Sequence, residues 1–460
     1  MNFIIIVSDT LRRDHLGCYG NKWISTPYID RFASQSTVCD RYYTGSFPTV
    51  PHRTDLFTGR FTFTYRDWAP LGNQEVVLSQ VLGEAGYTSM FIVDTPHLVR
   101  DAFGFDRGFT AWEWIRGQEN DRYRNYPHQV EMPCDPQKLR ETTRTVGQYL
   151  RNVAERTYES DYFAPMTMTR AAQWLEHNYK LDKFLLYVDT FDPHEPWDPP
   201  RYYVDMYDPG YEGEEVTYPI YGPATYLTEA ELRHMRALYA AELTMVDRWV
   251  GRLLQTIEDT GLLDNTAIFF LTDHGFYLGE HGLTGKIVML YEEVAHSPLI
   301  IRLPGQRQGA RCPAFVQPAD IMPTILDLAG VEVPPTVQGS SFVPVLKGEA
   351  EAIRDCAVTS YAITHPPVPG EPELDPENPY EWLKVARKLK PSTLTMDDWA
   401  LICGAGDFEP ELYNLKDDPG QKRNVFSEHR EVAERLHRRY VELLEWLGTD
   451  EQYLGPRRQL

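Results

Sequence analysis

The sequence predicts an α/β fold in which one large, mostly parallel β-sheet is sandwiched between helices and a smaller α+β part follows. Two observations predict it. Short, nearly continuous apolar runs recur along residues 1–350, and amphipathic segments separate them. Over residues 351–460 the pattern changes to isolated short strands and one long amphipathic segment. We therefore expect one large α/β domain over residues 1–350 and a C-terminal α+β subdomain over residues 351–460.

The expected strands of the large sheet lack the polar alternation of a half-exposed strand. Continuous apolar character is typical of parallel strands that are covered on both faces. The expected strands lie at residues 3–7, 89–93, 184–188, 267–271 and 299–302, and covering helices are expected at 78–85 and 230–258.

The C-terminal subdomain is predicted from a change of pattern after a proline-rich stretch at residues 366–379. Short strands are expected at 399–403 and 411–415, and a helix at 427–447. Few strands with one helix are typical of a small α+β unit packed on a larger domain.

Composition indicates a folded protein with an acidic surface. The chain has 460 residues, 42% of them hydrophobic, and a formal net charge of −22. Such a charge repels nucleic acid and anionic membranes at long range, so neither is expected as a partner. The net charge does not exclude a small anionic ester as the substrate, provided that cationic groups surround the site that binds it. A homo-oligomer is also compatible with the composition.

The sequence also predicts a location. Residues 1–7 have no basic segment before their apolar run, so we interpret them as a buried strand rather than a signal peptide. No stretch approaches the length of a membrane span. The six cysteines form no CxxC pair, which favours reduced thiols in a cytoplasmic protein. They are Cys18, Cys39, Cys134, Cys312, Cys356 and Cys403.

Polar side chains suited to chemistry follow three of the expected strands. Asp9 follows the first strand, Asp189 follows the third, and Asp273-His274 follows the fourth. The carboxyl ends of parallel strands meet at one edge of a sheet, so these groups are expected to converge. Carboxylates and an imidazole suit a divalent metal ion. The Asp-His pair taken alone is equally compatible with capping a turn.

Several short motifs follow one another along the chain. They are Thr49-Val50-Pro51-His52-Arg53 with Thr58-Gly59-Arg60, Pro193-His194-Glu195-Pro196, Asp273-His274-Gly275, Gly279-Glu280-His281-Gly282 with Gly285-Lys286, Ser297-Pro298-Leu299-Ile300-Ile301, and Glu411-Leu412-Tyr413-Asn414-Leu415. The first resembles the C/S-x-P-x-R segment of sulfatases, which belong to the alkaline phosphatase superfamily. The ordered set resembles that family over nearly the whole chain.

The resemblance implies a metal-dependent ester hydrolase. Asp9, Asp273 and His274 would bind one divalent ion, which could be Ca, Mn, Mg or Zn. The oxygen of Thr49 would complete the metal's shell and attack the substrate. A two-metal site, as in related phosphodiesterases, would need further ligands, for which Asp189, His194 and His365 are conceivable. A single metal is expected because their spacing is not the familiar one.

Other roles follow from the same resemblance. Arg53 would orient the nucleophile and stabilise its charged form. Lys286 and His194 would bind the oxygens of the transferred group or protonate the leaving group. Many sulfatases place a sulfate-binding lysine after the second strand, where this chain has Asp94-Thr95-Pro96-His97. Thr95 and His97 are therefore candidate substrate-binding residues.

The chain departs from sulfatases at the nucleophile. In sulfatases the Cys or Ser at this position is oxidised after synthesis to an aldehyde-bearing residue. This route is closed to Thr49 because a secondary alcohol gives at most a ketone. The segment Phe47-Pro48-Thr49 resembles nucleotide pyrophosphatase/phosphodiesterases instead. Thr10, where sulfatases often have a second metal-binding Asp, resembles phosphonate monoester hydrolases.

Three functional hypotheses follow. The leading one is a phosphate or phosphonate ester hydrolase that acts through Thr49. The second is a sulfuric ester hydrolase with an altered or substituted nucleophile, and the third is a catalytically lapsed binding protein. The polar stretch at 117–144 is interpreted either as a substrate-side insertion or as a surface excursion.

Overall fold

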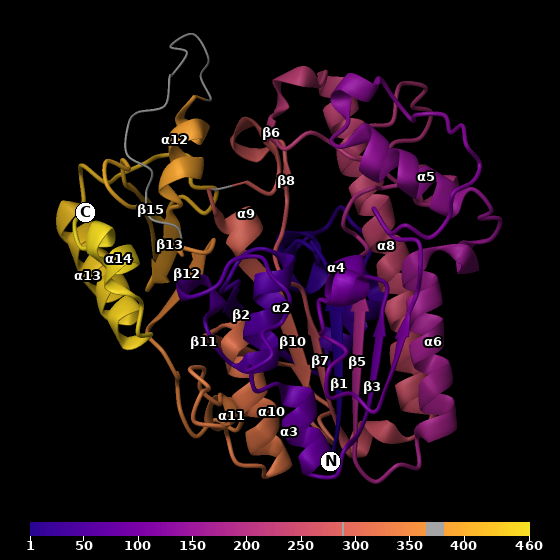
Figure 1. Ribbon diagram of the computed structural model, residues 1–460, viewed down its shortest axis with the longest axis horizontal. Coiled ribbons are helices and arrows are strands. Elements are labelled where there is room, and N and C mark those ends of the chain that lie inside the picture. The colour runs from indigo at the N-terminus through magenta and orange to yellow at the C-terminus, as the bar shows by residue number, and fades with distance from the viewer. Residues whose placement is uncertain (288, 365–380) are drawn as a thin grey trace. The chain divides into compact units, whose positions relative to one another are not determined.

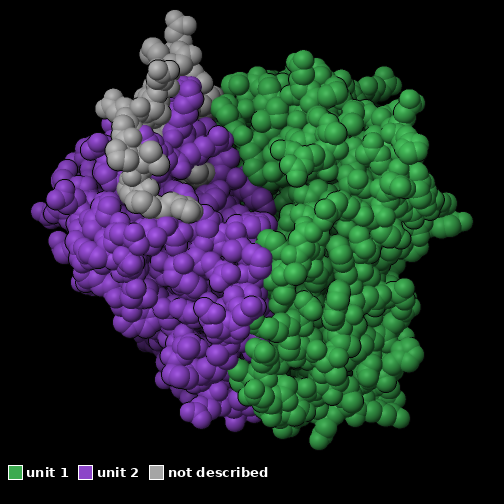
Figure 2. All heavy atoms as spheres, in the orientation of Figure 1, with its two compact units in different colours: residues 1–39, 79–285, 298–311 green, residues 40–78, 286–297, 312–460 purple. Residues whose placement is uncertain are grey.

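The computed structural model describes residues 1–287, 289–364 and 381–460 (Figure 1). Two compact units are coloured in Figure 2: the first comprises residues 1–39, 79–285 and 298–311, and the second residues 40–78, 286–297 and 312–460. Each unit combines several segments of the chain, whereas the sequence predicted two continuous domains. The expected domain boundary at residue 350 stays a prediction. His365 and the proline-rich stretch at 366–379 lie outside the described residues.

The large sheet has eight strands in the order β11-β2-β10-β7-β1-β5-β3-β4. Strand β1 pairs in parallel with both β5 and β7, β3 pairs in parallel with β5, and β10 runs antiparallel to β7. The strands are β1 Asn2–Ser8, β2 Thr37–Tyr43, β3 Thr88–Val93, β4 Ala111–Trp114, β5 Phe184–Thr190, β7 Thr266–Leu271, β10 His296–Arg302 and β11 Ala310–Val316. The predicted mostly parallel α/β class is confirmed.

One face of the sheet in the first unit is covered by two long helices. Alternate strand residues, among them Ile4, Ile6 and Leu186, pack against α6 (Phe163–Asn178) and α8 (Glu229–Asp259), which lie side by side in Figure 1. The intervening residues of β1 are buried as well. Burial on both faces is the physical reason for the continuous apolar runs in the sequence.

Helix α8 is fixed at its start and near its middle. Thr228 and Glu231 form a capping box: the Glu231 N–H donates to Thr228 Oγ1, and the Thr228 N–H donates to Glu231 Oε2 at 2.8 Å. Farther along, the Asp247 carboxylate accepts hydrogen bonds from the N–H groups of Tyr28 and Ile29, at 3.2 and 2.7 Å. These N–H groups open helix α1 (Pro27–Ala33), so Asp247 ties the two helices together.

The second unit contains a four-stranded antiparallel sheet in the order β12-β13-β14-β15. Its elements are β12 Cys356–Ser360, β13 Ser392–Met396, β14 Trp399–Cys403, β15 Glu411–Asn414 and helix α13 Arg430–Trp446. Leu394, Leu401 and Leu412 of the sheet share a buried cluster with Leu436 and Tyr440 of the helix. The predicted α+β character of this region is confirmed.

The structure tests two further sequence expectations only in part: the absence of a membrane span and the cytoplasmic location with reduced cysteines. No helix within the described residues combines the length and apolar character needed to cross a membrane. Cys18 is half-buried, and the other five cysteines are buried. The reduced state of the thiols and the cytoplasmic location stay predictions.

Candidate active site

The polar residues at the strand ends lie at one edge of the sheet in the first unit. Val7 of β1 is in register with Asp189 of β5 and with Leu271 of β7. Strands β1 and β7 therefore end side by side in the sheet. Asp9 comes two residues after Val7, and Asp273 comes two residues after Leu271. The Asp9 N–H donates to Thr190 O at 2.9 Å, which continues the pairing of β1 with β5 to the start of the site.

Three of the predicted metal ligands meet at this edge. Asp9, Asp273 and His274 are buried, and each offers a ligand atom within 4.8 Å of those of the other two. His274 Nδ1 lies 3.0 Å from the Gly275 carbonyl oxygen. A donating Nδ1–H leaves the lone pair of the neutral ring on Nε2, which lies 3.3 Å from Asp273 Oδ2. Two carboxylates and an imidazole nitrogen form a donor set that fits a divalent cation.

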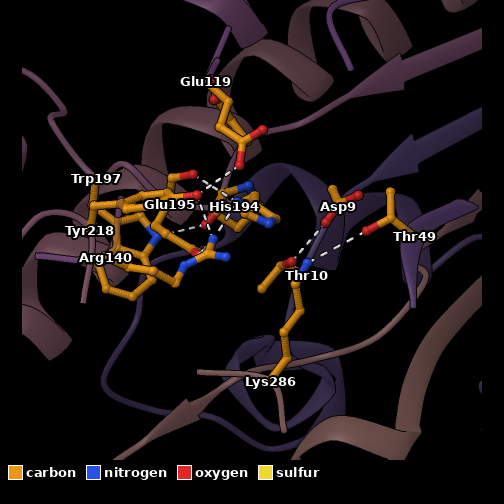
Figure 3. A network of polar contacts seen from close by, with 12 residues as sticks. Asp9, Thr10, Thr49, Glu119, Arg140, His194, Glu195, Trp197, Tyr218 and Lys286 are labelled. Atoms are coloured by element: carbon orange, nitrogen blue, oxygen red, sulfur yellow. Dashed lines mark hydrogen bonds and ion pairs between the residues drawn. The ribbon is translucent and has the colours of Figure 1, made fainter. Parts of the chain in front are cut away.

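Thr10 holds the two carboxylates in place. Its hydroxyl donates to Asp9 Oδ1 at 2.7 Å (Figure 3). Its N–H donates to Asp273 Oδ1 at 2.9 Å. Thr10 has φ = 59°, an unfavourable conformation for a β-branched residue. The Tyr239 hydroxyl of α8 donates to Thr10 O at 2.8 Å and secures that conformation. Sequence reasoning noticed the change at this position but not its structural role.

In the second unit, Thr49 is the first residue of α2 (Thr49–Thr58) and is only 1% exposed. Lys286 Nζ lies 3.5 Å from Thr49 Oγ1 (Figure 3). A helix N-terminus and an ammonium group both favour negative charge on a nearby oxygen. Arg53 is fully buried one helical turn after Thr49. Thr49, Arg53 and Lys286, which the resemblance assigns to catalysis, thus lie on or beside one helix start.

A buried carboxylate anchors the turn before α2. Asp55 accepts hydrogen bonds from the Ser46 N–H at 2.8 Å, the Ser46 hydroxyl at 2.7 Å and the Thr62 N–H at 2.7 Å. Burial raises the pKa of Asp55 to about 7, although these hydrogen bonds oppose the rise. No motif assigned this role to Asp55.

Comparison with known proteins decides the family. The sulfatase family model matches residues 1–331. The chain belongs to the sulfatase family of ester hydrolases. It is 27% identical to an N-acetylglucosamine-6-O-sulfatase of Bacteroides thetaiotaomicron, with 98% of this chain and 86% of the relative covered. It is 25% identical to human iduronate 2-sulfatase, with 74% and 71% covered.

Solved structures share the fold of this sulfatase-family protein. A protein solved in complex with its substrate D-glucosamine-2-N,6-O-disulfate matches with a TM-score of 0.74 at 23% identity, covering 100% of this chain and 99% of the other. A phosphonate monoester hydrolase of Agrobacterium radiobacter matches with a TM-score of 0.73 at 22% identity, covering 97% and 95%. The fold therefore occurs in proteins described as acting on sulfate esters and on phosphonate esters.

His194 of the sulfatase-family chain is held in one orientation. Its ring is 3% exposed and stacks on Phe191 with centroids 3.8 Å apart. Its Nδ1 lies 2.7 Å from the Glu195 carbonyl oxygen and 3.1 Å from Glu195 Oε2. These contacts engage Nδ1, so Nε2 is the nitrogen suited to act on a substrate oxygen.

Thr95 and Asp189 form a second buried contact near the strand ends. The Thr95 hydroxyl donates to Asp189 Oδ1 at 2.6 Å, and the Tyr187 hydroxyl donates to Asp189 Oδ2 at 2.9 Å. Both carboxylate oxygens of Asp189 thus accept hydrogen bonds from protein hydroxyls. This arrangement favours a structural role for Asp189 over metal ligation.

The two ends of the polar stretch at 117–144 are part of the site region. Glu119 Oε2 lies 2.9 Å from His97 Nε2, and Glu119 Oε1 accepts a hydrogen bond from Tyr218 at 2.7 Å. Arg140 donates to Tyr218 and, at 3.3 Å, to Glu195 Oε1 (Figure 3). Glu119 is buried, so the surface interpretation is wrong at this end of the stretch, whereas Arg140 is only half-buried. Glu119, Arg140 and Tyr218 were not predicted, since neither residue type nor spacing links them to His97.

Glu119 is charged in the folded protein. Burial by itself raises the pKa of Glu119, but the attraction of His97, with smaller effects from His194 and Arg140, holds that pKa well below its usual range. Its ion pair therefore stabilises the fold above the unfolded pKa of about 4.3, and this contribution is lost as the pH falls below that value.

The Glu119→Gln substitution tests this charge. At pH 6 we expect it to lower the free energy of unfolding by about 1–3 kcal/mol, because a hydrogen bond between charged groups is lost. The difference from the unaltered protein should shrink as the pH falls from about 5 to 3, because Glu119 of the unfolded wild-type chain gains a proton there while the folded carboxylate stays charged. Urea unfolding followed by fluorescence across this range measures the difference. A difference that grows toward low pH would contradict the assignment.

Proposed function

We propose that this protein hydrolyses phosphate or phosphonate esters by double displacement through an unmodified Thr49. The observation that carries the proposal is a threonine at the start of α2, with the Lys286 ammonium 3.5 Å from its hydroxyl, at the nucleophile position of the family motif. The small anionic ester expected from the sequence is the substrate class. A sulfuric ester hydrolase with an altered nucleophile is the second candidate, because the curated relatives named above are sulfatases.

We further propose that Asp9, Asp273 and His274 hold one divalent cation. Their buried oxygen and nitrogen donors lie close enough together to share one ion. When bound, such an ion lowers the pKa of a nearby hydroxyl and polarises substrate oxygens. Thr10 supports this role by fixing both carboxylates through its hydroxyl and N–H. The two-metal alternative is disfavoured by the hydroxyl partners of Asp189.

The chain's own residues carry the two displacements. In the first, Thr49 gives its hydroxyl proton to bulk water, its Oγ1 forms a bond to phosphorus while the bond to the leaving oxygen breaks, and the leaving oxygen takes a proton from His194 Nε2. In the second, water attacks the same phosphorus, gives a proton to His194, and expels Thr49 Oγ1, which regains a proton from bulk water. Lys286 and Arg53 stabilise negative charge on the transferred group and on the nucleophile. Thr95 and His97 are proposed to bind the substrate.

The threonine side chain favours phosphorus over sulfur. In sulfatases the aldehyde hydrate releases sulfate by collapsing to the aldehyde, which breaks a carbon–oxygen bond. Thr49 has a methyl group where that second hydroxyl would stand, so its sulfate ester has no such exit. A phosphothreonyl ester is opened instead by attack at phosphorus.

Kinetics on matched para-nitrophenyl esters test this preference. We expect kcat/KM for the phosphate or phenylphosphonate ester to exceed that for the sulfate by more than about tenfold, which corresponds to about 1.4 kcal/mol of transition-state stabilisation. The leaving group is the same in all three, so the difference reports on the transferred group. Intact-mass analysis of the same sample shows whether Thr49 is unmodified.

The Thr49→Cys variant is the matched control because it restores the C-x-P-x-R motif. Produced together with a sulfatase-modifying enzyme, it should gain the aldehyde by mass and turn over the sulfate ester faster than the unaltered chain. An unmodified threonine enzyme that hydrolyses the sulfate as fast as every phosphorus ester would favour the second candidate.

A further inference from the structure

Glu195 is a buried carboxylate in direct contact with His194. Its Oε2 lies 3.1 Å from His194 Nδ1, and its side chain is fully buried. The ring of His194 is already oriented by two other contacts: Nδ1 lies 2.7 Å from the Glu195 carbonyl oxygen, and the ring stacks on Phe191. The side chain of Glu195 therefore adds a negative charge beside Nδ1 rather than the orientation of the ring.

Two hydrogen-bond donors hold the other oxygen of this carboxylate. Glu195 Oε1 accepts a hydrogen bond from Arg140 Nη2 at 3.3 Å (Figure 3) and another from the Tyr221 hydroxyl. Burial raises the pKa of Tyr221 well above its usual value, so this phenol keeps its proton and donates it. A carboxylate that accepts two hydrogen bonds, one of them from a cation, is stabilised in its charged form.

The two donors are themselves fixed by packing in the first unit. The guanidinium carbon of Arg140 lies 3.9 Å from the ring centre of Tyr221. The Tyr221 ring packs over Gly285, where a β-carbon would lie 2.4 Å from a ring atom, and edge-on against Phe276 with 5.7 Å between the ring centres. Because Oε1 is held in this way, rotation of the carboxyl group is restricted and Oε2 stays beside the imidazole.

Further ionisable groups near His194 have partners of their own. Glu119 pairs with His97, whose Nε2 lies 2.9 Å from Glu119 Oε2. His97 attracts the charge of Glu119 more strongly than His194 does. Asp192 accepts hydrogen bonds from a side-chain amide and from a backbone N–H, and Tyr218 donates to Glu119. The carboxylate beside Nδ1, in contrast, contacts the His194 ring itself.

We propose that Glu195 is a positioning residue whose charge keeps a proton on His194 Nε2 until the leaving oxygen takes that proton. The inference rests on His194 being the proton donor of the proposed function. Two opposite charges in contact in a buried site stabilise one another, so Glu195 favours the doubly protonated ring. When Nε2 gives its proton to the leaving oxygen, Nδ1 keeps its own, and the attacking water of the second displacement returns a proton to Nε2.

Esters of two phenols of different basicity test this role on the full chain. A phenyl ester needs a proton on its leaving oxygen more than a para-nitrophenyl ester does, because phenolate is the stronger base. For Glu195→Gln we expect kcat/KM to fall by about tenfold to a hundredfold with the phenyl ester and by less than about threefold with the para-nitrophenyl ester. Equal losses with the two esters overturn the proposal, since a general structural defect does not distinguish leaving groups.

Glu231→Gln is the matched control. It removes a buried carboxylate of the same unit, and glutamine can serve in the capping box at the start of α8 as glutamate does. We expect kcat/KM for both esters to change by less than about twofold, with their ratio unchanged. A ratio that changes as much as in Glu195→Gln overturns the proposal, because loss of any buried charge would then have the same effect.

Nitrogen NMR of the unaltered protein depends neither on the folding of a variant nor on turnover. With histidine labelled with nitrogen-15, the two ring nitrogens of His194 report whether both carry a proton. We expect a doubly protonated ring at about pH 7.5, where an ordinary histidine with its pKa of about 6.5 is mostly neutral. A neutral ring at that pH overturns the proposal.

The choice of esters separates this inference from the proposed function. Faster turnover of sulfate than of phosphorus esters contradicts the proposed preference for phosphorus alone. The comparison of phenyl with para-nitrophenyl leaving groups is then made with sulfate esters. The same larger loss for the phenyl ester of Glu195→Gln is expected there, and equal losses again overturn the role of Glu195.

Discussion

Replacing Thr49 by alanine is expected to remove turnover of every ester, by at least about a thousandfold, while the metal content stays unchanged. The substitution deletes the attacking oxygen but none of the three proposed metal ligands, Asp9, Asp273 and His274. Initial rates on the para-nitrophenyl esters and metal analysis of the same protein measure both quantities.

Thr54→Ala is the matched control for this experiment. Thr54 is a buried threonine of the same helix, and its hydroxyl donates to Val50 O at 2.9 Å. Its loss should leave turnover within about tenfold of the unaltered protein and lower stability by about 1 kcal/mol. If Thr49→Ala retained turnover comparable to that of Thr54→Ala, Thr49 would not be the nucleophile.

Asp273→Asn is expected to abolish both metal retention and turnover. The substitution removes one of the two negative charges of the proposed site and places an amide where Asp273 Oδ1 accepts the N–H groups of Thr10 and His274. Changes in outer-shell partners already cost about 10–100-fold in metal affinity, and loss of a direct ligand should exceed this. Metal analysis after dialysis gives the content per chain, and excess metal in the assay shows how much turnover it rescues.

Asp189→Asn serves as the comparison. It removes a buried carboxylate from the neighbouring strand, but both its oxygens accept hydrogen bonds from protein hydroxyls. With one metal per chain, this variant should keep its metal. Loss of half the bound metal from Asp189→Asn would instead support a two-metal site, and full metal retention by Asp273→Asn would contradict the proposed ligand set.

The parallel strands were predictable because burial on both faces makes their sequences continuously apolar. All seven residues of β1 are buried. Partly exposed strands were missed for the same reason: β4, although it is parallel to β3, begins with the exposed Ala111 and Trp112, and β11 begins with the exposed Ala310 and Arg311. Their pairing is decided by neighbours distant in the chain rather than by their own pattern.

The candidate site was predictable where a motif names a residue and unpredictable where contacts bring distant residues together. Asp9, Asp273 and His274 follow strand ends, so topology alone predicts their meeting. Glu119 and Arg140 reach His97 and Glu195 from a stretch without regular pattern, and only the folded chain reveals those contacts.

The length of helix α8 is constrained because two residues along it make contacts with different parts of the chain. It is 31 residues long, Tyr239 near its middle donates to Thr10 O, and Asp247 two turns later holds the start of α1. One residue inserted between Tyr239 and Asp247 would rotate one contact relative to the other by about 100° and shift it by about 1.5 Å. Length differences among descendants of this gene are therefore expected in the loops on either side of α8, and the helix itself should diverge only by substitution.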